Sequence, residues 1–435
     1  MFKLTNKYDK YFLIIFFIGI FFRILSLLIV PIRPDAASYI EAAKSIIHLN
    51  YETHRPPGFP LTILPFLLLI QNDIIAAKLA SFSAGILLIF FSYIIFRKAS
   101  IVLFKTENSK HKTKFIGLLT SCLISFNSYF ASNSGMGLRE NLLALQLILV
   151  FYYTVIKERA QLKDYLISGI LISFLTLTLL TAGIFVAISI FLFYLIAKIK
   201  YFKFVIKDYK KLIFLISSFA LTFLIWTLFC AAHFGSPFYN WEYQSSWFKR
   251  NTIVDLTSLG TLPLILIQAS ITGFIEIFID LFLLIGVVFM LLVFYILLKN
   301  IRNKSQLFFI FIVVGVNFFY LSVFITTPRL IMYFFPLIFY IGAIPLGEIY
   351  MQNQALKENK ENSMNLMKKI DYFLLSFYVT YIFRNFNYYF YFPEEFLYFN
   401  PFLLIVVITI IFLLYNEISL LIYLRKNREI SYSKL

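Results

Sequence analysis

Apolar runs long enough to cross a membrane recur along this chain, and they restrict its fold more than any other feature. A helix needs about 20 consecutive apolar residues to span a bilayer. The first run, from Tyr11 to Pro31, meets that length and contains Arg23 as its one charged residue. We predict an all-α, polytopic membrane protein with about 12 transmembrane helices. The runs lie near residues 11–31, 75–96, 115–131, 138–156, 165–180, 183–197, 212–232, 270–298, 306–325, 330–347, 372–391 and 400–424.

The composition excludes a soluble globular domain, because 60% of the 435 residues are hydrophobic and only 14% are charged. The first run is too long for the core of a signal peptide and no small-residue cleavage site follows it, so we expect it to remain as a span. Cys122 and Cys230 lie within apolar runs and are interpreted as packing residues. With 4 His and no metal-ligand spacing, the sequence predicts neither a metal site nor a cofactor.

The net charge of +17 would suit nucleic acid, but the positions of the basic residues argue against that partner. Most of the 39 Lys and Arg residues lie near the two ends of the chain or in the loops 97–114, 157–163, 198–211, 299–304 and 348–371. Basic loops stay on the cytoplasmic side during insertion. The pattern predicts cytoplasmic N- and C-termini, contact with the lipid bilayer and no nucleic-acid partner.

The other basic residues lie in spans or in loops predicted outside the cytoplasm, where insertion gives no reason for them. A charged side chain within a span costs ~2.5–3.5 kcal/mol, so these residues are expected to have a partner or a function. Arg23 and Arg384 are exceptions, since we expect them to extend to the membrane surface. The set comprises Arg23, Arg33, Lys44, Arg55, Lys78, Arg139, Lys249, Arg250, Arg329 and Arg384.

The polar stretch from Ile32 to Pro60 follows the first span and contains the sharpest candidates for function. Pro34 can open a helix because its missing N–H is not needed there, and Asp35 suits the positive helix end. Apolar residues then recur at helical spacing, which predicts an amphipathic helix along the membrane surface. Three prolines in His54–Pro60 prevent a regular helix, so we expect a rigid turn back to the bilayer. The apolar face comprises Ala36, Ile40, Ala43 and Ile47, and the polar face comprises Glu41, Lys44 and His48.

Each charged candidate has a structural explanation as well as a functional one. Asp35 is either a residue that favours the helix start or a catalytic carboxylate. Arg55, with His54 beside it, is either an anchor for lipid headgroups or a phosphate ligand. Lys249 and Arg250 lie among aromatic residues in the outer loop near 233–263, which suits an interfacial belt as well as a binding role.

Two further outer turns place an arginine at the start of a span. In the turn 133–141, Arg139 and Glu140 are either a self-neutralising ion pair or a charged pair that contacts a ligand. In the turn 326–330, Arg329 would lie at the positive end of its helix, where a cation is unfavourable. That misfit favours an anionic partner.

One outer carboxylate and several outer guanidinium groups suit transfer of a group from a phosphate. A carboxylate can take a proton from an incoming hydroxyl group. Arginine holds and neutralises a departing phosphate through its planar fork of donors. Because these groups border the membrane, the phosphate is expected to belong to a lipid.

From the N-terminus to about residue 346, the order of these motifs resembles the GT-C superfamily of polytopic glycosyltransferases. The branch that it resembles includes protein mannosyltransferases, aminoarabinose transferases and RgtA-like enzymes. The motifs are Asp35 and Tyr39 after the first span, Arg55-Pro56-Pro57-Gly58-Phe59-Pro60, the Arg139-Glu140 turn and Pro328-Arg329-Leu330.

Such enzymes transfer a sugar from a polyprenyl-phosphate donor to an acceptor outside the cytoplasm, with inversion at the anomeric carbon. The resemblance implies that Asp35 is the general base and that the donor phosphate binds Arg55, Arg139 and Arg329. It also favours a bacterial inner membrane and a lipid or glycan acceptor. The supporting residues would be Tyr39, Glu140, His54, Lys249 and Arg250.

The sequence departs from this pattern at two places. Ala36 stands where protein O-mannosyltransferases have a second acidic residue, which makes a protein acceptor less expected. Thr176, Thr178 and Thr181 stand where relatives often have arginine, which leaves the donor contacts of that span open.

Two other functions stay open at this point. A flippase for lipid-linked glycans would line an interior path with arginine, whereas the charges here collect at one face. A polymerase or ligase of surface polysaccharide would use one large outer loop, for which His233, Lys249 and Arg250 are the candidate set. We expect a catalytic module over residues 1–346, a cytoplasmic linker over 347–371, and a final pair of spans with a basic tail over 372–435.

Overall fold

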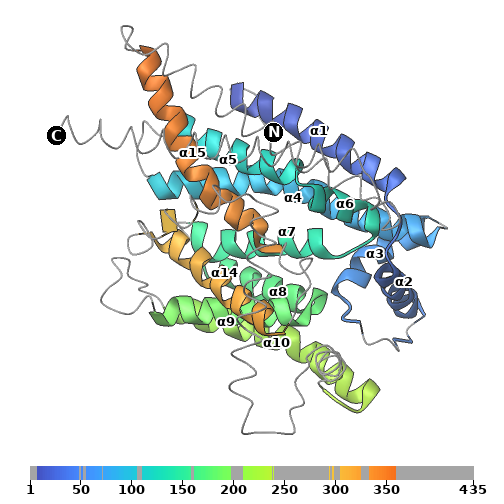
Figure 1. Ribbon diagram of the computed structural model, residues 1–435. Helices are drawn as coiled ribbons and strands as arrows, with labels where there is room; N and C mark the ends of the chain where they lie inside the picture. Colours follow the sequence, from blue (N-terminus) through green and yellow to red (C-terminus); the bar gives the residue numbers. More distant parts are fainter. Residues whose placement is uncertain are drawn as a thin grey trace.

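The computed structural model describes residues 7–48, 50–51, 55–70, 72–104, 110–157, 161–196, 209–237, 239, 293, 296–297, 304–324 and 333–358. The described elements are all helical, which confirms the predicted all-α class (Figure 1). They are α1 (Lys7–Ile29), α2 (Pro34–Ile47), α3 (Gly58–Leu69), α4 (Asp73–Phe104), α5 (Lys110–Ser125), α6 (Ser128–Met136), α7 (Glu140–Phe151) with the π-helical η2 (Tyr152–Ile156), α8 (Leu162–Thr178), α9 (Leu180–Ile196), α10 (Tyr209–Phe234), α14 (Ser305–Phe324) and α15 (Phe335–Glu358).

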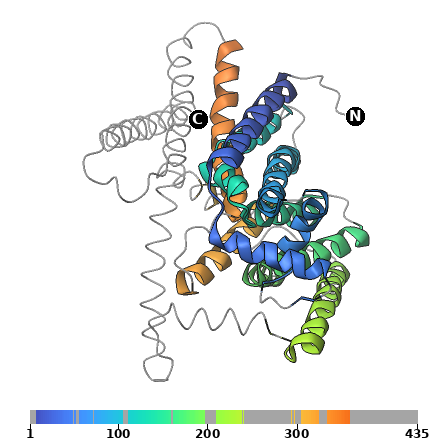
Figure 2. The same cartoon turned by 90° about the vertical axis from the view of Figure 1, so that its right-hand side faces the viewer.

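The long helix α4 is the centre of the first half of the bundle. It packs against α1, α3, α5, α6 and α7, and α8 continues the bundle from α7 towards α9 and α10. Aromatic side chains fill the interior, where Phe96 stacks on Tyr340 of α15 with ring centroids 4.9 Å apart. Figure 2 looks onto the end of the bundle where α2 and α3 lie, which we call the α2 end.

Three helices in the described part are long and apolar enough to cross a membrane, namely Tyr8–Ile29, Asp73–Phe104 and Leu212–Phe234. A fourth arises if the bent pair His111–Ser125 and Tyr129–Met136 is one span. Shorter apolar helices include α3, α9 and part of α14. The total of about 12 spans stays a prediction, since several of the predicted runs lie outside the described residues.

The bend between α5 and α6 explains why Arg23 lies within a span. Arg23 is fully buried, and the expectation that it extends to the membrane surface is wrong. Its guanidinium group donates to the carbonyl oxygens of Gly19 at 3.1 Å, Ser125 at 3.2 Å and Ile124 at 3.4 Å. The last carbonyls of a helix have no partner within the helix, so Arg23 satisfies the end of α5.

Helix α3 begins earlier than the proline content predicts. Gly58 to Pro60 form its first turn, although we expected all of His54–Pro60 to be non-helical. The first N–H groups of a helix have no partner within it, so the missing donor of Pro60 costs little there. The N–H of Leu61 donates to the Pro57 carbonyl at 2.8 Å and closes that turn.

Helix α15 continues to Glu358, so the first part of the segment expected to be a linker is helical. The division at residue 346 stays a prediction. Helices α8 and α9 are separated only by Leu179 and pack against each other, which confirms two helices in the region 165–197.

Candidate functional site

The amino-terminal end of α2 is held against the turn between α6 and α7. Pro34 begins α2 as predicted, and the N–H of Arg33 donates to the Met136 carbonyl at 3.2 Å. Gly137 ends α6 with φ of 71°, a left-handed conformation that glycine adopts without steric cost. The chain can therefore turn sharply and place Arg139 beside the first turn of α2.

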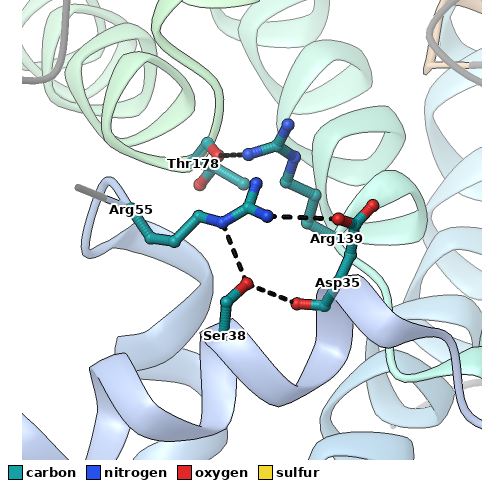
Figure 3. A network of polar contacts seen from close by, with 5 residues as sticks. All are labelled: Asp35, Ser38, Arg55, Arg139 and Thr178. Atoms are coloured by element: carbon teal, nitrogen blue, oxygen red, sulfur yellow. Dashed lines mark hydrogen bonds and ion pairs between the residues drawn. The ribbon is translucent and has the colours of Figure 1, made fainter. Parts of the chain in front are cut away.

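Asp35 and Arg55 form an ion pair at this end of the bundle (Figure 3). The Arg55 guanidinium donates to Asp35 Oδ1 at 3.1 Å and, through Nε, to Ser38 Oγ at 2.9 Å. The Ser38 hydroxyl in turn donates to the Asp35 carbonyl at 2.8 Å. The side chains of Arg55 and Asp35 are 23% and 35% exposed, so water reaches the pair and its energy is about 1 kcal/mol or less.

Arg139 approaches the same space from α7. It is 6% exposed and donates to the Thr178 carbonyl, the last residue of α8, at 3.1 Å. The partial negative charge at a helix C-terminus stabilises a cation. Figure 3 shows the guanidinium groups of Arg55 and Arg139 turned towards each other, beside Thr178.

Tyr39 connects the two arginines. It is 1% exposed, and its ring centre lies 5.0 Å from the Arg55 guanidinium carbon and 5.5 Å from that of Arg139. The ring of Phe59 packs edge-on against that of Tyr39, with their centroids 5.2 Å apart. Burial raises the pKa of Tyr39; the charges of Arg139 and Arg55 oppose this rise, and those of Glu140 and Asp35 add to it. The phenol is therefore neutral at pH 7 and serves as an aromatic platform for both cations.

Gly58 allows α3 to approach the end of α8. A Cβ atom at Gly58 would lie 2.5 Å from Thr178 Oγ1 and 2.6 Å from the Thr178 backbone nitrogen. The glycine of the Arg55–Pro60 motif is thus required for contact between α3 and the residue that binds Arg139. Gln146 supports the same residue, because its amide donates to Thr178 Oγ1 at 3.1 Å.

Glu140 is the first residue of α7 and is 1% exposed. A carboxylate is favoured at the positive end of a helix, which suits this position. Its charge is among those that affect the pKa of Tyr39. Glu140 therefore belongs to the same electrostatic environment as Asp35, Arg55 and Arg139.

The structure brings together five of the residues predicted from the sequence: Asp35, Tyr39, Arg55, Arg139 and Glu140. The other predicted site residues, His54, Lys249, Arg250 and Arg329, lie outside the described residues.

Sequence reasoning missed Ser38 and gave no role to Thr178. Ser38 follows Asp35 by one helical turn, a signal that could have identified it. Thr178 is notable in the sequence only because it replaces an arginine, and its contact could not be predicted because its backbone carbonyl makes it. Within the described ranges, no group of three or more His, Cys, Asp or Glu side chains could hold a metal ion.

The chain has a polytopic helical fold that it shares with solved structures, and this is the fold that the resemblance in the sequence implied. Two solved structures show this similarity. The first is the archaeal oligosaccharyltransferase AglB from Archaeoglobus fulgidus in complex with an inhibitory peptide and a dolichol-phosphate. It is 15% identical, with a TM-score of 0.58 over 88% of this chain and 56% of that chain.

The second solved structure is ArnT from Cupriavidus metallidurans bound to undecaprenyl phosphate. It is 13% identical, with a TM-score of 0.55 over 85% of this chain and 69% of that chain. This chain therefore spans little more than half the length of AglB. No protein-family model and no curated protein matches the sequence. The fold and the apolar helices make the chain an integral membrane protein.

Proposed function

We propose that this protein is an inverting glycosyltransferase that moves a sugar from a polyprenyl-phosphate donor to an acceptor at the non-cytoplasmic membrane face. The observation that carries the proposal is the pairing of two guanidinium groups on the Tyr39 ring beside one partly exposed carboxylate, Asp35. A lipid phosphate is the anion that such a site suits at the end of a transmembrane bundle. Lipid phosphates in the AglB and ArnT structures support this choice.

In the proposed reaction, the acceptor hydroxyl group gives its proton to the Asp35 carboxylate as its oxygen attacks the anomeric carbon. The bond between that carbon and the donor phosphate oxygen breaks, and the electron pair remains on the polyprenyl phosphate. Arg55 and Arg139 stabilise the charge that develops on this leaving group. Arg329 remains a predicted third phosphate ligand.

The ion pair between Asp35 and Arg55 also sets an order of events. While Arg55 donates to Asp35 Oδ1, the carboxylate oxygen and the guanidinium group are engaged with each other. A donor phosphate competes for Arg55 and thereby releases Asp35 to accept a proton. On this proposal the base becomes fully active only when the donor is bound.

The orientation and the membrane are parts of the proposal too. The loops rich in Lys and Arg would be cytoplasmic, which places the α2 end outside, at a bacterial inner membrane. The acceptor would be a lipid or a glycan. Single cysteines introduced at exposed Lys44 and at Lys98 report the orientation, because an impermeant thiol reagent should label only the first in intact cells.

The test of the function is transfer of labelled sugar from a polyprenyl-phosphate donor by the purified protein in liposomes. Asp35→Asn keeps the size of the side chain but cannot accept the proton, and should lower transfer by about 10²–10⁴-fold. Asp73→Asn is the matched control, since Asp73 pairs with Lys44 on the exposed surface. Full transfer by folded Asp35→Asn would remove Asp35 as the base. A flippase would instead move the donor across the bilayer with the sugar still attached.

A further inference from the structure

Tyr51 lies between the end of α2 and Arg55, and α10 holds it in place. It is 5% exposed. Its ring packs edge-on against Trp226 and Phe229 of α10, with ring centroids 5.7 Å and 6.3 Å apart, respectively. Aromatic contacts of this geometry stabilise a pair by about 0.5–1.5 kcal/mol beyond burial. The position of Tyr51 is thus set by a helix distant in the sequence.

The Tyr51 hydroxyl donates to the backbone carbonyl of Arg55. Arg55 is therefore fixed at two points, its backbone by Tyr51 and its guanidinium group by Asp35 and Ser38. Only the second point lies in the proposed phosphate site. A phosphate that displaces Asp35 would leave the Tyr51 contact intact.

Burial raises the pKa of Tyr51, so its hydroxyl group remains a hydrogen-bond donor at neutral pH. A buried hydroxyl group needs a partner, since an unpaired one costs about 1–3 kcal/mol. The Arg55 carbonyl supplies that partner. The contact thus links the packing of Tyr51 to the backbone that carries the first phosphate-binding arginine.

We propose that Tyr51 is a positioning residue for donor binding: α10 holds its ring, and its hydroxyl group fixes the Arg55 backbone so that the guanidinium group is pre-organised for the donor phosphate. This inference rests on the proposed function. It assigns to α10 and to a tyrosine outside the sequence motifs a role in donor affinity. Pre-organisation improves binding by reducing the entropy lost when the ligand arrives.

Tyr51→Phe tests the role, because it keeps the ring against Trp226 and Phe229 and removes only the hydroxyl group. We expect the donor KM to rise about 3- to 10-fold, the usual effect of one lost hydrogen bond, with kcat at saturating donor nearly unchanged. A tyrosine that only fills space would leave both constants unchanged on replacement by phenylalanine. Trp226→Leu, which weakens the support of the ring, should raise the donor KM in the same direction.

Tyr93→Phe is the matched control. It also removes one buried hydroxyl group, which donates to Asp9 at 2.6 Å. This contact lies far from the proposed phosphate site, towards the end of the bundle opposite α2. We expect thermal stability to fall and the donor KM to stay at the wild-type value. An equal rise in KM for Tyr93→Phe, or no rise for Tyr51→Phe, would overturn the inference.

Direct binding separates this inference from the proposed function. Undecaprenyl phosphate is titrated into wild-type protein and Tyr51→Phe in detergent, and thermal stabilisation is recorded. If the wild type binds and the variant binds about 3- to 10-fold more weakly, both proposals are supported. Equal binding by the two proteins overturns the role of Tyr51 alone, whereas no binding by the wild type overturns both proposals.

Discussion

The two ends of the helical bundle use charge in opposite ways. At the end opposite α2, cations surround a buried carboxylate. Asp9 is 5% exposed and accepts from Tyr93 at 2.6 Å and Arg97 at 3.4 Å, with the Lys114 ammonium 3.8 Å away. At the α2 end, two guanidinium groups surround a buried aromatic ring. The first arrangement satisfies a carboxylate and joins helices, and the second is the site that we propose for the donor phosphate.

The partners of the charged groups make the same distinction. Lys157 and Asp164 pair at 2.6 Å and Lys112 and Glu348 at 3.1 Å, both at the end opposite α2. These pairs join packed elements, the end of η2 to α8 in the first case and α5 to α15 in the second. Arg139, in contrast, donates to a backbone carbonyl at the end of α8. On our proposal its guanidinium group serves the donor phosphate, whereas the cations of the pairs at the opposite end serve a carboxylate.

Among the variants that leave the proposed base in place, Arg139→Gln is expected to have the largest effect. Charge-assisted hydrogen bonds contribute about 1.5–3 kcal/mol, so the donor KM should rise by about 10- to 100-fold. The measurement is the dependence of the initial transfer rate on donor concentration in liposomes. Arg97→Gln changes the same charge at the opposite end and should leave the donor KM unchanged. If both variants change KM equally, the two ends do not differ as described.

Gly58→Ala is expected to have the next largest effect. The added Cβ would overlap with Thr178, so α3 and the α8 terminus must separate and Arg139 loses its position. Overpacking of this kind costs about 1–3 kcal/mol, and transfer should fall by about 10-fold.

Gly315→Ala is the control for that variant, because nothing lies within 4 Å of a Cβ placed there. It should leave transfer intact and favour helix α14 slightly, by up to about 1 kcal/mol. Similar activity of both glycine variants would count against close packing at Thr178.

Asp9→Asn should affect stability and spare catalysis. The change removes the charge that pairs with Arg97 and Lys114 and lowers the free energy of unfolding by about 1–3 kcal/mol. Thermal unfolding in detergent measures this loss. Transfer per folded molecule should equal that of the wild type, and a selective loss of donor affinity would show that the opposite end also serves the reaction.

Lys44→Met should have the smallest effect. Lys44 pairs with Asp73 on the surface, with side chains 48% and 43% exposed. Exposed ion pairs contribute about 1 kcal/mol or less. We expect unchanged transfer and a shift in unfolding temperature near the error of the measurement; a clear loss of transfer would extend the site along α2.

Local chemistry made much of the α2 end predictable from the sequence. Pro34 and Asp35 start a helix for reasons contained in those residues, and Ala36, Ile40 and Ala43 share one face of it as their spacing predicted. That face is buried against α3 and α4, whereas the sequence predicted a helix along the membrane surface. Ile47 is 40% exposed because α2 ends there. The proximity of Asp35 to Arg55 and Arg139 followed from motif order and resemblance rather than from local propensity.

Contacts made by the backbone or set by tertiary packing could not be predicted. Arg23 is buried because α5 stops at Ser125 and leaves carbonyls to satisfy, and no pattern around Arg23 reports that. The contact of Arg139 depends on where α8 ends, and that of Tyr51 on α10. Helix ends and helix neighbours are properties of the whole fold, which is why periodicity alone missed these roles.

The most direct test of the central claim is binding of undecaprenyl phosphate to wild-type protein and to Asp35→Asn, measured side by side. If the phosphate replaces Asp35 on Arg55, the variant should bind the lipid up to about 5-fold more tightly than the wild type, because its arginine is no longer partly neutralised, while transferring almost no sugar. Binding that is unchanged or weaker in Asp35→Asn would contradict the shared use of Arg55 by carboxylate and phosphate.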